Sequence, residues 1–200
     1  MKHKGIRLTI DKREDKNTIS HKFKKDFIDL FEDSKWKREG SILEVSCYRG
    51  YTTNVLSHLF KQVYAVEIDK YTLERAKKYN RNRKNIKFIT GNVYNSKGWD
   101  GLPKADVIFI DCQHDYGSVI SDTKNAIKHI KGNSGLIVFD DYGRYKTVRD
   151  AVKDTLKGSG QFTFLRYMGE PEGSKCRPGK ILTDWEGVVI SYEKGNISEQ

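Results

Sequence analysis

The sequence contains 200 residues, of which 36% are hydrophobic and 32% are charged. This length suits a single domain that can bury a sizeable core. No apolar run approaches the roughly 20 residues that a membrane-spanning helix needs, and no apolar segment follows the charged N-terminus, so we expect no membrane partner and no signal peptide. The three cysteines are an odd number at wide spacing without the pattern of a metal site, which favours a reducing, cytoplasmic location.

The formal net charge of +10 is concentrated in two segments, residues 2–25 and residues 70–87. A basic surface attracts polyanions such as nucleic acids. The second segment is also typical of the solvated outer side of a helix, so both interpretations stay open. Because residues 1–20 are polar and highly charged, we predict a loosely held basic arm there, followed by a single domain over residues 21–200.

Hydrophobic periodicity divides this domain into alternating helices and strands. It begins with a predicted amphipathic helix from Phe23 to about Trp36. Buried strands are predicted over residues 42–45, 63–68, 86–90, 105–110 and 135–139, and helices over residues 53–60, 70–79, 119–130 and 148–156. Such alternation requires a parallel sheet with right-handed crossovers.

Two final strands, residues 162–167 and 185–192, have no helix between them and predict an antiparallel hairpin at one edge of the sheet. The predicted fold is therefore α/β, with a seven-stranded, mostly parallel sheet and helices on both faces.

The segment from Ser41 to Phe60 is where the sequence first indicates a ligand site. A short strand is followed by a loop that contains Gly50, and a helix is predicted to begin at Thr53-Asn54. This order places backbone N–H groups and a helix N-terminus at the carboxyl end of a strand, which is where open α/β sheets bind ligands. The alternative is an ordinary strand-to-helix connection.

Acidic residues stand at the ends of four of the five predicted parallel strands: Glu44, Glu67, Asp111 and the pair Asp140-Asp141. Parallel strands end at one edge of a sheet, about 4.8 Å apart, so these side chains are expected to converge. Helix capping could explain one of them alone but does not easily explain acids on four strands. The position of Glu67, after the second strand, suits the two hydroxyls of a ribose.

The later acids suggest a metal site. Asp111, Asp140 and Asp141 would repel one another unless a cation lay between them. Oxygen ligands suit Mg²⁺, or less specifically Ca²⁺ and Mn²⁺. His114 follows Asp111 by three residues and is a candidate general base, the alternative being an ordinary surface histidine.

These segments resemble class I S-adenosylmethionine-dependent methyltransferases, in particular the metal-dependent O-methyltransferases such as the catechol and macrocin enzymes. Residues 44–53 are similar to the first motif of that family, residues 66–69 to its ribose-binding motif, residues 91–93 to its adenine pocket, and residues 111–116 to the segment after its fourth strand. The resemblance implies a Rossmann-like methyltransferase fold that uses S-adenosylmethionine and Mg²⁺ or another divalent cation.

The resemblance also implies roles for individual residues. The implied cofactor-binding residues are Glu44, Ser46, Tyr48, Gly50, Glu67, Ile68, Asn92, Val93 and Asp111. The implied metal ligands are Asp111, Asp140 and Asp141, and the implied catalytic base is His114.

Two residues depart from the family pattern. Ser46 stands where the first glycine of the loop is usual, and Gln113 stands where the sugar-modifying branch often has an aspartate base. We expect methyl transfer to a hydroxyl of a small-molecule acceptor, either a sugar or a phenol. Two alternatives stay open: a nucleic-acid acceptor held by the basic segments, and a module that binds the cofactor without turnover. The oligomeric state is also open, and a homodimer is one option.

Overall fold

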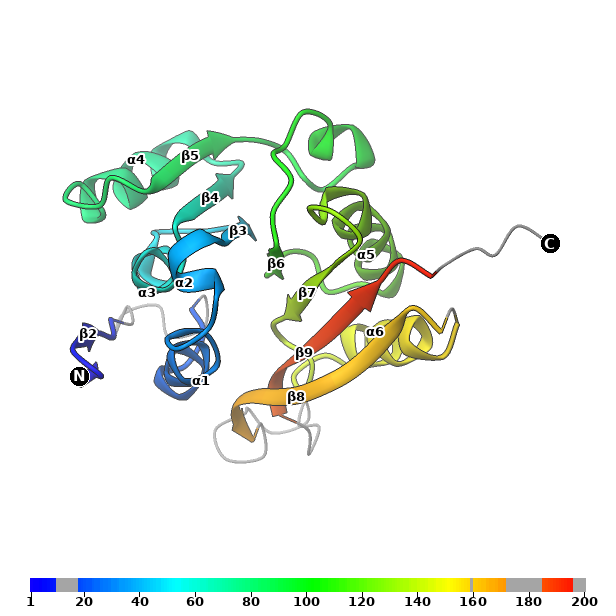
Figure 1. The fold of residues 1–200 in the computed structure, drawn as a ribbon. Helices are drawn as coiled ribbons and strands as arrows, with labels where there is room; N and C mark the ends of the chain where they lie inside the picture. Colours follow the sequence, from blue (N-terminus) through cyan, green and yellow to red (C-terminus); the bar gives the residue numbers. More distant parts are fainter. Residues whose placement is uncertain (10–17, 159, 172–184, 196–200) are drawn as a thin grey trace.

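The computed structural model describes residues 1–9, 18–158, 160–171 and 185–195. Its central sheet consists of β3 (Ser41–Val45), β4 (Gln62–Glu67), β5 (Ile86–Thr90), β6 (Val107–Ile110), β7 (Ser134–Phe139), β8 (Phe162–Pro171) and β9 (Trp185–Glu193). The strands lie in the order β5-β4-β3-β6-β7-β9-β8 (Figure 1). The strands from β5 to β7 are parallel, whereas β9 pairs antiparallel with both β7 and β8. The sheet topology predicted from the sequence is therefore confirmed.

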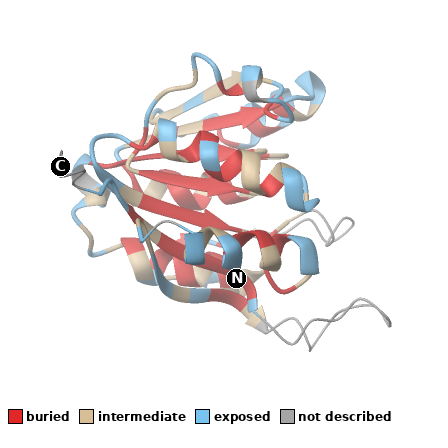
Figure 2. Cartoon of the chain, turned by 90° about the vertical axis from the view of Figure 1, so that its right-hand side faces the viewer, coloured by how far each residue is buried: buried red, intermediate tan, exposed pale blue. Residues whose placement is uncertain are grey.

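Helices cover both faces of the sheet. They are α1 (His21–Phe31), α2 (Trp36–Glu39), α3 (Tyr51–Leu59), α4 (Lys70–Tyr79), α5 (Tyr116–His129) and α6 (Lys146–Gly158), with a 3₁₀ turn, η1 (Ser96–Trp99), after β5. The apolar faces of α1, α3 and α4 pack on one side, and those of α5 and α6 pack on the other. In Figure 2 the buried strands lie between helices whose outer sides are exposed.

Side-chain alternation along the strands decides which core each residue joins. Ile42 and Val107 pack with α1 and α3, whereas their neighbours Leu43 and Ile108 pack with α5 and α6. The central strands carry apolar residues on both faces, as expected for a parallel sheet covered on each side. This alternation continues past the strand ends and orients the acids described below.

The N-terminal segment differs from the predicted loose arm. Strands β1 (Lys2–His3) and β2 (Ile6–Arg7) form a small antiparallel hairpin. Ile6, Leu8 and Ile19 are buried in the core that α1 and α3 share. The sequence prediction rested on the many charged residues and overlooked these apolar side chains, whose burial attaches residues 1–9 to the domain. Residues 10–17 of the predicted arm lie outside the described residues.

Two helix boundaries also differ from the prediction. The leading helix does not run on to Trp36 but ends at Phe31, where the Ser34 hydroxyl donates a 2.7 Å hydrogen bond to the Phe31 carbonyl oxygen. A hydroxyl that binds this carbonyl competes with continuation of the helix. The helix after the loop begins at Tyr51, two residues before the predicted start.

The other elements lie within a few residues of their predicted ranges. The structure extends the first strand of the terminal hairpin to Pro171, and the connection over residues 172–184 lies outside the described residues. Among the helices that the structure describes, none has the length and apolar character required to cross a membrane.

Candidate active site

The loop between β3 and α3 has an unusual backbone. Ser46, Tyr48 and Gly50 all have positive φ angles, of 71°, 47° and 74°. Only glycine adopts this conformation without steric cost. At Gly50 an added Cβ would also lie 2.6 Å from the side-chain nitrogen of Asn80, so a larger residue would not fit there. Ser46, which replaces the expected first glycine, instead adopts the left-handed conformation as a non-glycine residue.

Glu67 holds this loop in place from the end of β4. Its Oε2 accepts a 2.9 Å hydrogen bond from the Tyr48 amide, and its Oε1 accepts from the amides of Ile68 (2.9 Å) and Asp69 (3.0 Å). Burial raises the pKa of Glu67, and the two amides on Oε1 oppose that rise. A carboxylate has about four acceptor positions, so one position on Oε2 stays available to a ligand. Glu67 is thus both a loop anchor and a candidate ribose acceptor.

The other predicted cofactor residues follow the same edge of the sheet. Ile68 is 39% exposed directly after β4. After the neighbouring strand β5, the Asn92 side-chain oxygen accepts a hydrogen bond from the Tyr94 amide (3.1 Å). Val93 is buried in the core, and its carbonyl oxygen accepts from the Trp99 indole at 3.2 Å. Ile68 and Asn92 can therefore line a ligand site, whereas the Val93 side chain packs in the core beneath them.

Glu44 is the acid at the end of β3, and it is almost completely buried at 1% exposure. Its Oε2 accepts a 2.6 Å hydrogen bond from the Thr53 hydroxyl of α3. Burial raises the pKa of Glu44 to about 8, an effect that the Thr53 hydrogen bond opposes and the charge of Asp111 reinforces. Glu44 is therefore largely protonated at neutral pH in this state of the protein.

Lys24 of α1 is a buried cation near the acids at the strand ends, and the sequence interpretation missed it. It is fully buried, and its Nζ donates to the Thr9 carbonyl oxygen at 2.7 Å. Burial lowers its pKa to about 8, although the charges of nearby acids, Glu186 and Glu44 first among them, raise it. A signal was present in the sequence: Lys24 lies on the same helical face as Phe27 and Phe31, where a charged residue is out of place.

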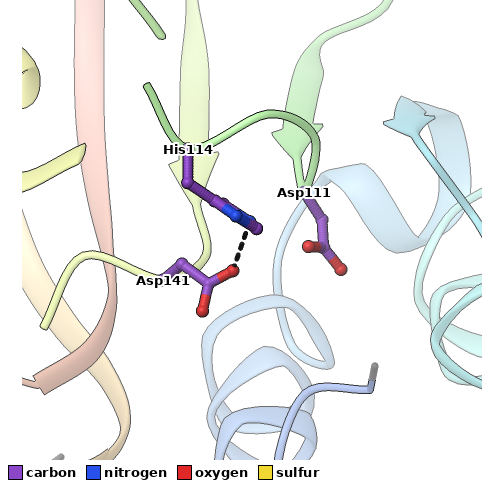
Figure 3. A group of neighbouring side chains, drawn as sticks. All are labelled: Asp111, His114 and Asp141. Carbon is purple, nitrogen blue, oxygen red and sulfur yellow. Dashed lines mark ion pairs between the residues drawn. The ribbon is translucent and has the colours of Figure 1, made fainter. Parts of the chain in front are cut away.

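Asp111, His114 and Asp141 form a compact group at the ends of β6 and β7 (Figure 3). One ligand atom from each residue lies within 4.8 Å of the others. The His114 Nε2 is 2.7 Å from Asp141 Oδ2, and Arg144 Nη1 is 3.5 Å from the other oxygen of Asp141. The ring of Tyr145 stacks on the His114 ring with centroids 4.2 Å apart. The imidazole is thereby fixed in both position and orientation.

Asp140, which was predicted to share this site, is not part of the group. Its amide donates to the Ile110 carbonyl oxygen at 3.1 Å, so the β6–β7 pairing continues through it. Side chains alternate along a strand, so the Asp140 side chain lies on the same face as that of Val138, toward α1. Asp141 has a positive φ of 58°, so its own side chain departs from this alternation. The Asp140 Oδ1 is buried and has no hydrogen-bond partner among the described residues. The sequence could not show this, because it did not reveal the turn at Asp141.

The charges within the group influence one another. Burial and the charge of Asp141 raise the pKa of Asp111 to about 7. Burial and the charges of Asp141 and Asp111 hold the pKa of Asp140 well above its usual range. Burial lowers the pKa of His114, but the hydrogen bond and charge of Asp141 outweigh this and leave it raised. Asp141 therefore stabilises the protonated form of His114.

Gln113, the other departure from the family pattern, has a structural contact in place of a catalytic one. Its side-chain oxygen accepts a 2.8 Å hydrogen bond from the Ser118 hydroxyl in the first turn of α5. His114 is the residue of this segment that lies near both Asp111 and Asp141, and its role as a base stays a prediction. Two carboxylates and one imidazole are also a donor set that suits a divalent cation, and the imidazole favours Mn²⁺ or a later transition metal over Mg²⁺.

Comparison with known proteins identifies the family. A family model described as a methyltransferase domain matches residues 43–142, which is half of the chain. The chain therefore belongs to this family of methyltransferase domains. The matched range begins in β3 and ends after β7, so it contains the loop at Gly50, Glu67 and the Asp111–His114–Asp141 group.

One curated relative matches a smaller part of the chain. The protein-L-isoaspartate O-methyltransferase of Helicobacter pylori is 33% identical over 87 residues, which cover 41% of this chain. The match spans 40% of the length of that relative. Its activity is therefore a property of that protein and is not carried over to this chain.

Solved structures show the same fold. The O-methyltransferase from Bacillus cereus in complex with SAH has a TM-score of 0.64 at 16% identity, covering 90% of this chain and 84% of that one. An rRNA methylase from Streptococcus thermophilus has a TM-score of 0.55 at 15% identity, covering 84% and 92%. The fibrillarin pre-rRNA processing protein of Methanococcus jannaschii has 0.57 at 19%, covering 81% and 70%. These likenesses establish the Rossmann-like methyltransferase fold implied by the sequence resemblance, and at such identities they establish the fold alone.

Proposed function

We propose that this protein transfers a methyl group from S-adenosylmethionine to a hydroxyl of a small-molecule acceptor, assisted by a divalent cation. The observation that carries the proposal is the Asp111–His114–Asp141 group, which lies at the carboxyl end of the sheet in a methyltransferase domain. Removal of a hydroxyl proton requires a positioned proton acceptor, and a neighbouring carboxylate stabilises the positive charge that an imidazole gains.

The cofactor site in this proposal lies over the ends of β3, β4 and β5. S-adenosylmethionine, when bound, supplies a methyl group made electrophilic by its sulfonium charge. Glu67 offers its remaining Oε2 acceptor position to a ribose hydroxyl, and exposed Ile68 offers an apolar surface to the adenine. The left-handed loop from Ser46 to Gly50 brings backbone groups against the same space.

His114 is the proposed base. Asp141 raises its pKa in the metal-free protein, and the neutral imidazole is the form that can accept a proton from the acceptor hydroxyl. Asp141, 2.7 Å from Nε2, then stabilises the imidazolium that forms. A base must be neutral to accept a proton, so the methyl-transfer rate should increase with pH. A cation held by Asp111 and Asp141 would oppose the rise that these carboxylates cause in the pKa of His114, so this increase should occur at lower pH with the cation bound.

The metal ligands in this proposal are Asp111 and Asp141. A divalent cation held by these carboxylates would lower the pKa of an acceptor hydroxyl as a Lewis acid. His114 lies close enough to be a third ligand, but a ligating imidazole could not also take the proton. His114→Ala separates the two roles: as a base alone, its loss abolishes methyl transfer but leaves Mn²⁺ affinity within a few-fold of the wild-type value.

Calorimetric titration tests the proposal. S-adenosylmethionine and S-adenosylhomocysteine are titrated into the protein with and without Mg²⁺ or Mn²⁺. The protein is then assayed with sugars, catechols, an isoaspartyl peptide and RNA as acceptors. The proposal expects cofactor binding, transfer to a sugar or catechol hydroxyl, loss of transfer in EDTA, and its return with Mg²⁺ or Mn²⁺. Full activity in EDTA would remove the metal from the mechanism, and cofactor binding without any transfer would favour a module that has lost turnover.

A further inference from the structure

A basic groove lies on the outer side of α4, next to the loop that precedes α3. It has a volume of about 740 Å³. Four cationic side chains line it: Arg75 and Lys78 of α4, Arg81 just beyond that helix, and Arg49 of the loop. Two segments separated in the sequence thus contribute positive charge to one concave surface.

Little acidic charge faces two of these four cations, Lys78 and Arg81. Among the described residues that line the groove, the one acid is Glu74, which forms an ion pair with Lys77 at 2.7 Å, and Lys77 does not line the groove. Within the part of the chain that the structure describes, neither Lys78 nor Arg81 has an ion-pair partner. These cations are therefore available to a polyanion, in contrast to Lys146 or Lys157 of α6, which pair with neighbouring aspartates.

Tyrosines alternate with the cations. Tyr51, Tyr71 and Tyr79 all line the groove. Tyr71 is 72% exposed, with the Arg75 guanidinium carbon 5.8 Å from its ring centroid. Exposed phenol rings among guanidinium groups can stack on bases while the cations bind the phosphates between them. A solvated helix face requires the charges but does not require the exposed aromatic rings.

Two hydrogen bonds link the groove to the buried Lys24. The Tyr79 hydroxyl donates to Thr9 Oγ1 at 2.7 Å, and the Thr9 carbonyl oxygen accepts from the buried Lys24 at the same distance. Tyr51 is also the first residue of α3, directly after Gly50 of the proposed cofactor loop. A strand bound in the groove would therefore lie beside the proposed cofactor site.

We infer that this groove binds single-stranded nucleic acid. The cations contact successive phosphates, and Tyr71 stacks on an unpaired base. A duplex, whose bases are already stacked, could use the charges but not the ring. This inference goes beyond the proposed function and does not depend on it, because binding is measured without methyl transfer, and a strand bound here need not be the acceptor.

Fluorescence anisotropy of a labelled oligouridine, titrated with the full chain at several salt concentrations, tests the inference. For single strands log K falls with log salt by about 0.7 for each phosphate contact, so at 0.1 M salt two lost contacts lower the affinity about 25-fold. Lys78→Gln/Arg81→Gln should show that loss, together with a salt slope shallower by about 1.4. Tyr71→Ala should weaken binding about tenfold without changing the slope.

The matched control is Lys124→Gln/Lys128→Gln on α5, which removes the same charge from two exposed lysines on the opposite face of the sheet. Its affinity should stay within about twofold of wild type, since distant charges are largely screened at this salt. Circular dichroism of each variant confirms folding. The inference is overturned by absence of oligouridine binding at low salt, by equal losses in the two double variants, or by a duplex that binds as tightly as the single strand with Tyr71→Ala unaffected.

Discussion

Glu44→Gln should stabilise the protein at neutral pH. Glu44 is fully buried with a pKa of about 8, against an ordinary value of 4.5. Its folded-state pKa is raised, so the native protein binds more protons than the unfolded chain between these two values. The stability contributed by protonated Glu44 is therefore complete below pH 4.5 and is lost as the pH rises toward 8.

The size of the effect follows from the two pKa values. At pH 7 the unfolded carboxyl has passed its pKa by about 2.5 pH units, which at 1.36 kcal/mol per unit is roughly 3 kcal/mol of lost stability. A glutamine cannot ionise, and its carbonyl oxygen can still accept the hydrogen bond from the Thr53 hydroxyl. The difference in free energy of unfolding between Glu44→Gln and wild type should therefore grow in favour of the variant by roughly 3 kcal/mol between pH 4.5 and pH 7.

Urea unfolding followed by circular dichroism at half-unit steps from pH 4.5 to pH 8.5 measures this difference. Glu39→Gln on α2 is the matched control, because this glutamate is exposed, and its unfolding curve should follow that of wild type across the range. If the free energies of unfolding of wild type and Glu44→Gln stayed parallel with pH, Glu44 would be ionised in the folded protein and the account of its burial would be wrong.

Three further predictions concern the metal group, the cofactor loop and the N-terminal hairpin. Asp141→Asn should lower Mn²⁺ affinity at least tenfold, whereas Asp140→Asn should leave it within a few-fold. If calorimetry found the reverse, it would support Asp140 as a metal ligand, as predicted from the sequence. Glu67→Ala should weaken S-adenosylhomocysteine binding by roughly 1.5–3 kcal/mol and also lower stability, because three backbone amides lose their acceptor; unchanged affinity would remove the ribose assignment. Leu8→Ala should lower the free energy of unfolding by about 2–4 kcal/mol, whereas Lys2→Ala should lower it by under about 0.5 kcal/mol. If Leu8→Ala left the free energy of unfolding unchanged, residues 1–9 would be the loosely held arm predicted from the sequence.

The sheet was readable from the sequence because its signals are local. Each parallel strand is a short apolar run bounded by polar residues, and each following helix has its own periodicity and, at Asp69 and Asp115, its own capping aspartate. The observed ranges of α4 and β5 agree with the predicted ones. Convergence of acids at one edge followed from parallel topology alone.

What the sequence could not provide depends on single backbone angles and on contacts between distant segments. Asp140 and Asp141 are chemically identical neighbours, and only the left-handed turn at Asp141 separates a residue facing His114 from one facing α1. Lys24 forms its hydrogen bond to Thr9, and comes under the charges of the strand-end acids, only after α1 has packed on the sheet. The burial of Ile6 and Leu8 likewise depends on a surface that α1 and α3 create together.

The molecule combines an excess of basic residues with a cluster of acidic residues at one edge of its sheet. The chain has a formal net charge of +10, yet the sheet edge brings together Glu44, Asp111 and Asp140, whose charges act on the buried Lys24. Desolvation keeps several of these acids protonated, so this edge of the sheet holds protons that a bound cation can displace. S-adenosylmethionine carries a positive sulfonium, and a divalent metal carries two charges, so each would bind more tightly as these acids ionise. On this reasoning, binding of either cation at pH 7 should release protons, in an amount that calorimetry in buffers of different ionisation enthalpy can measure, and binding without proton release would show that the acids are already ionised.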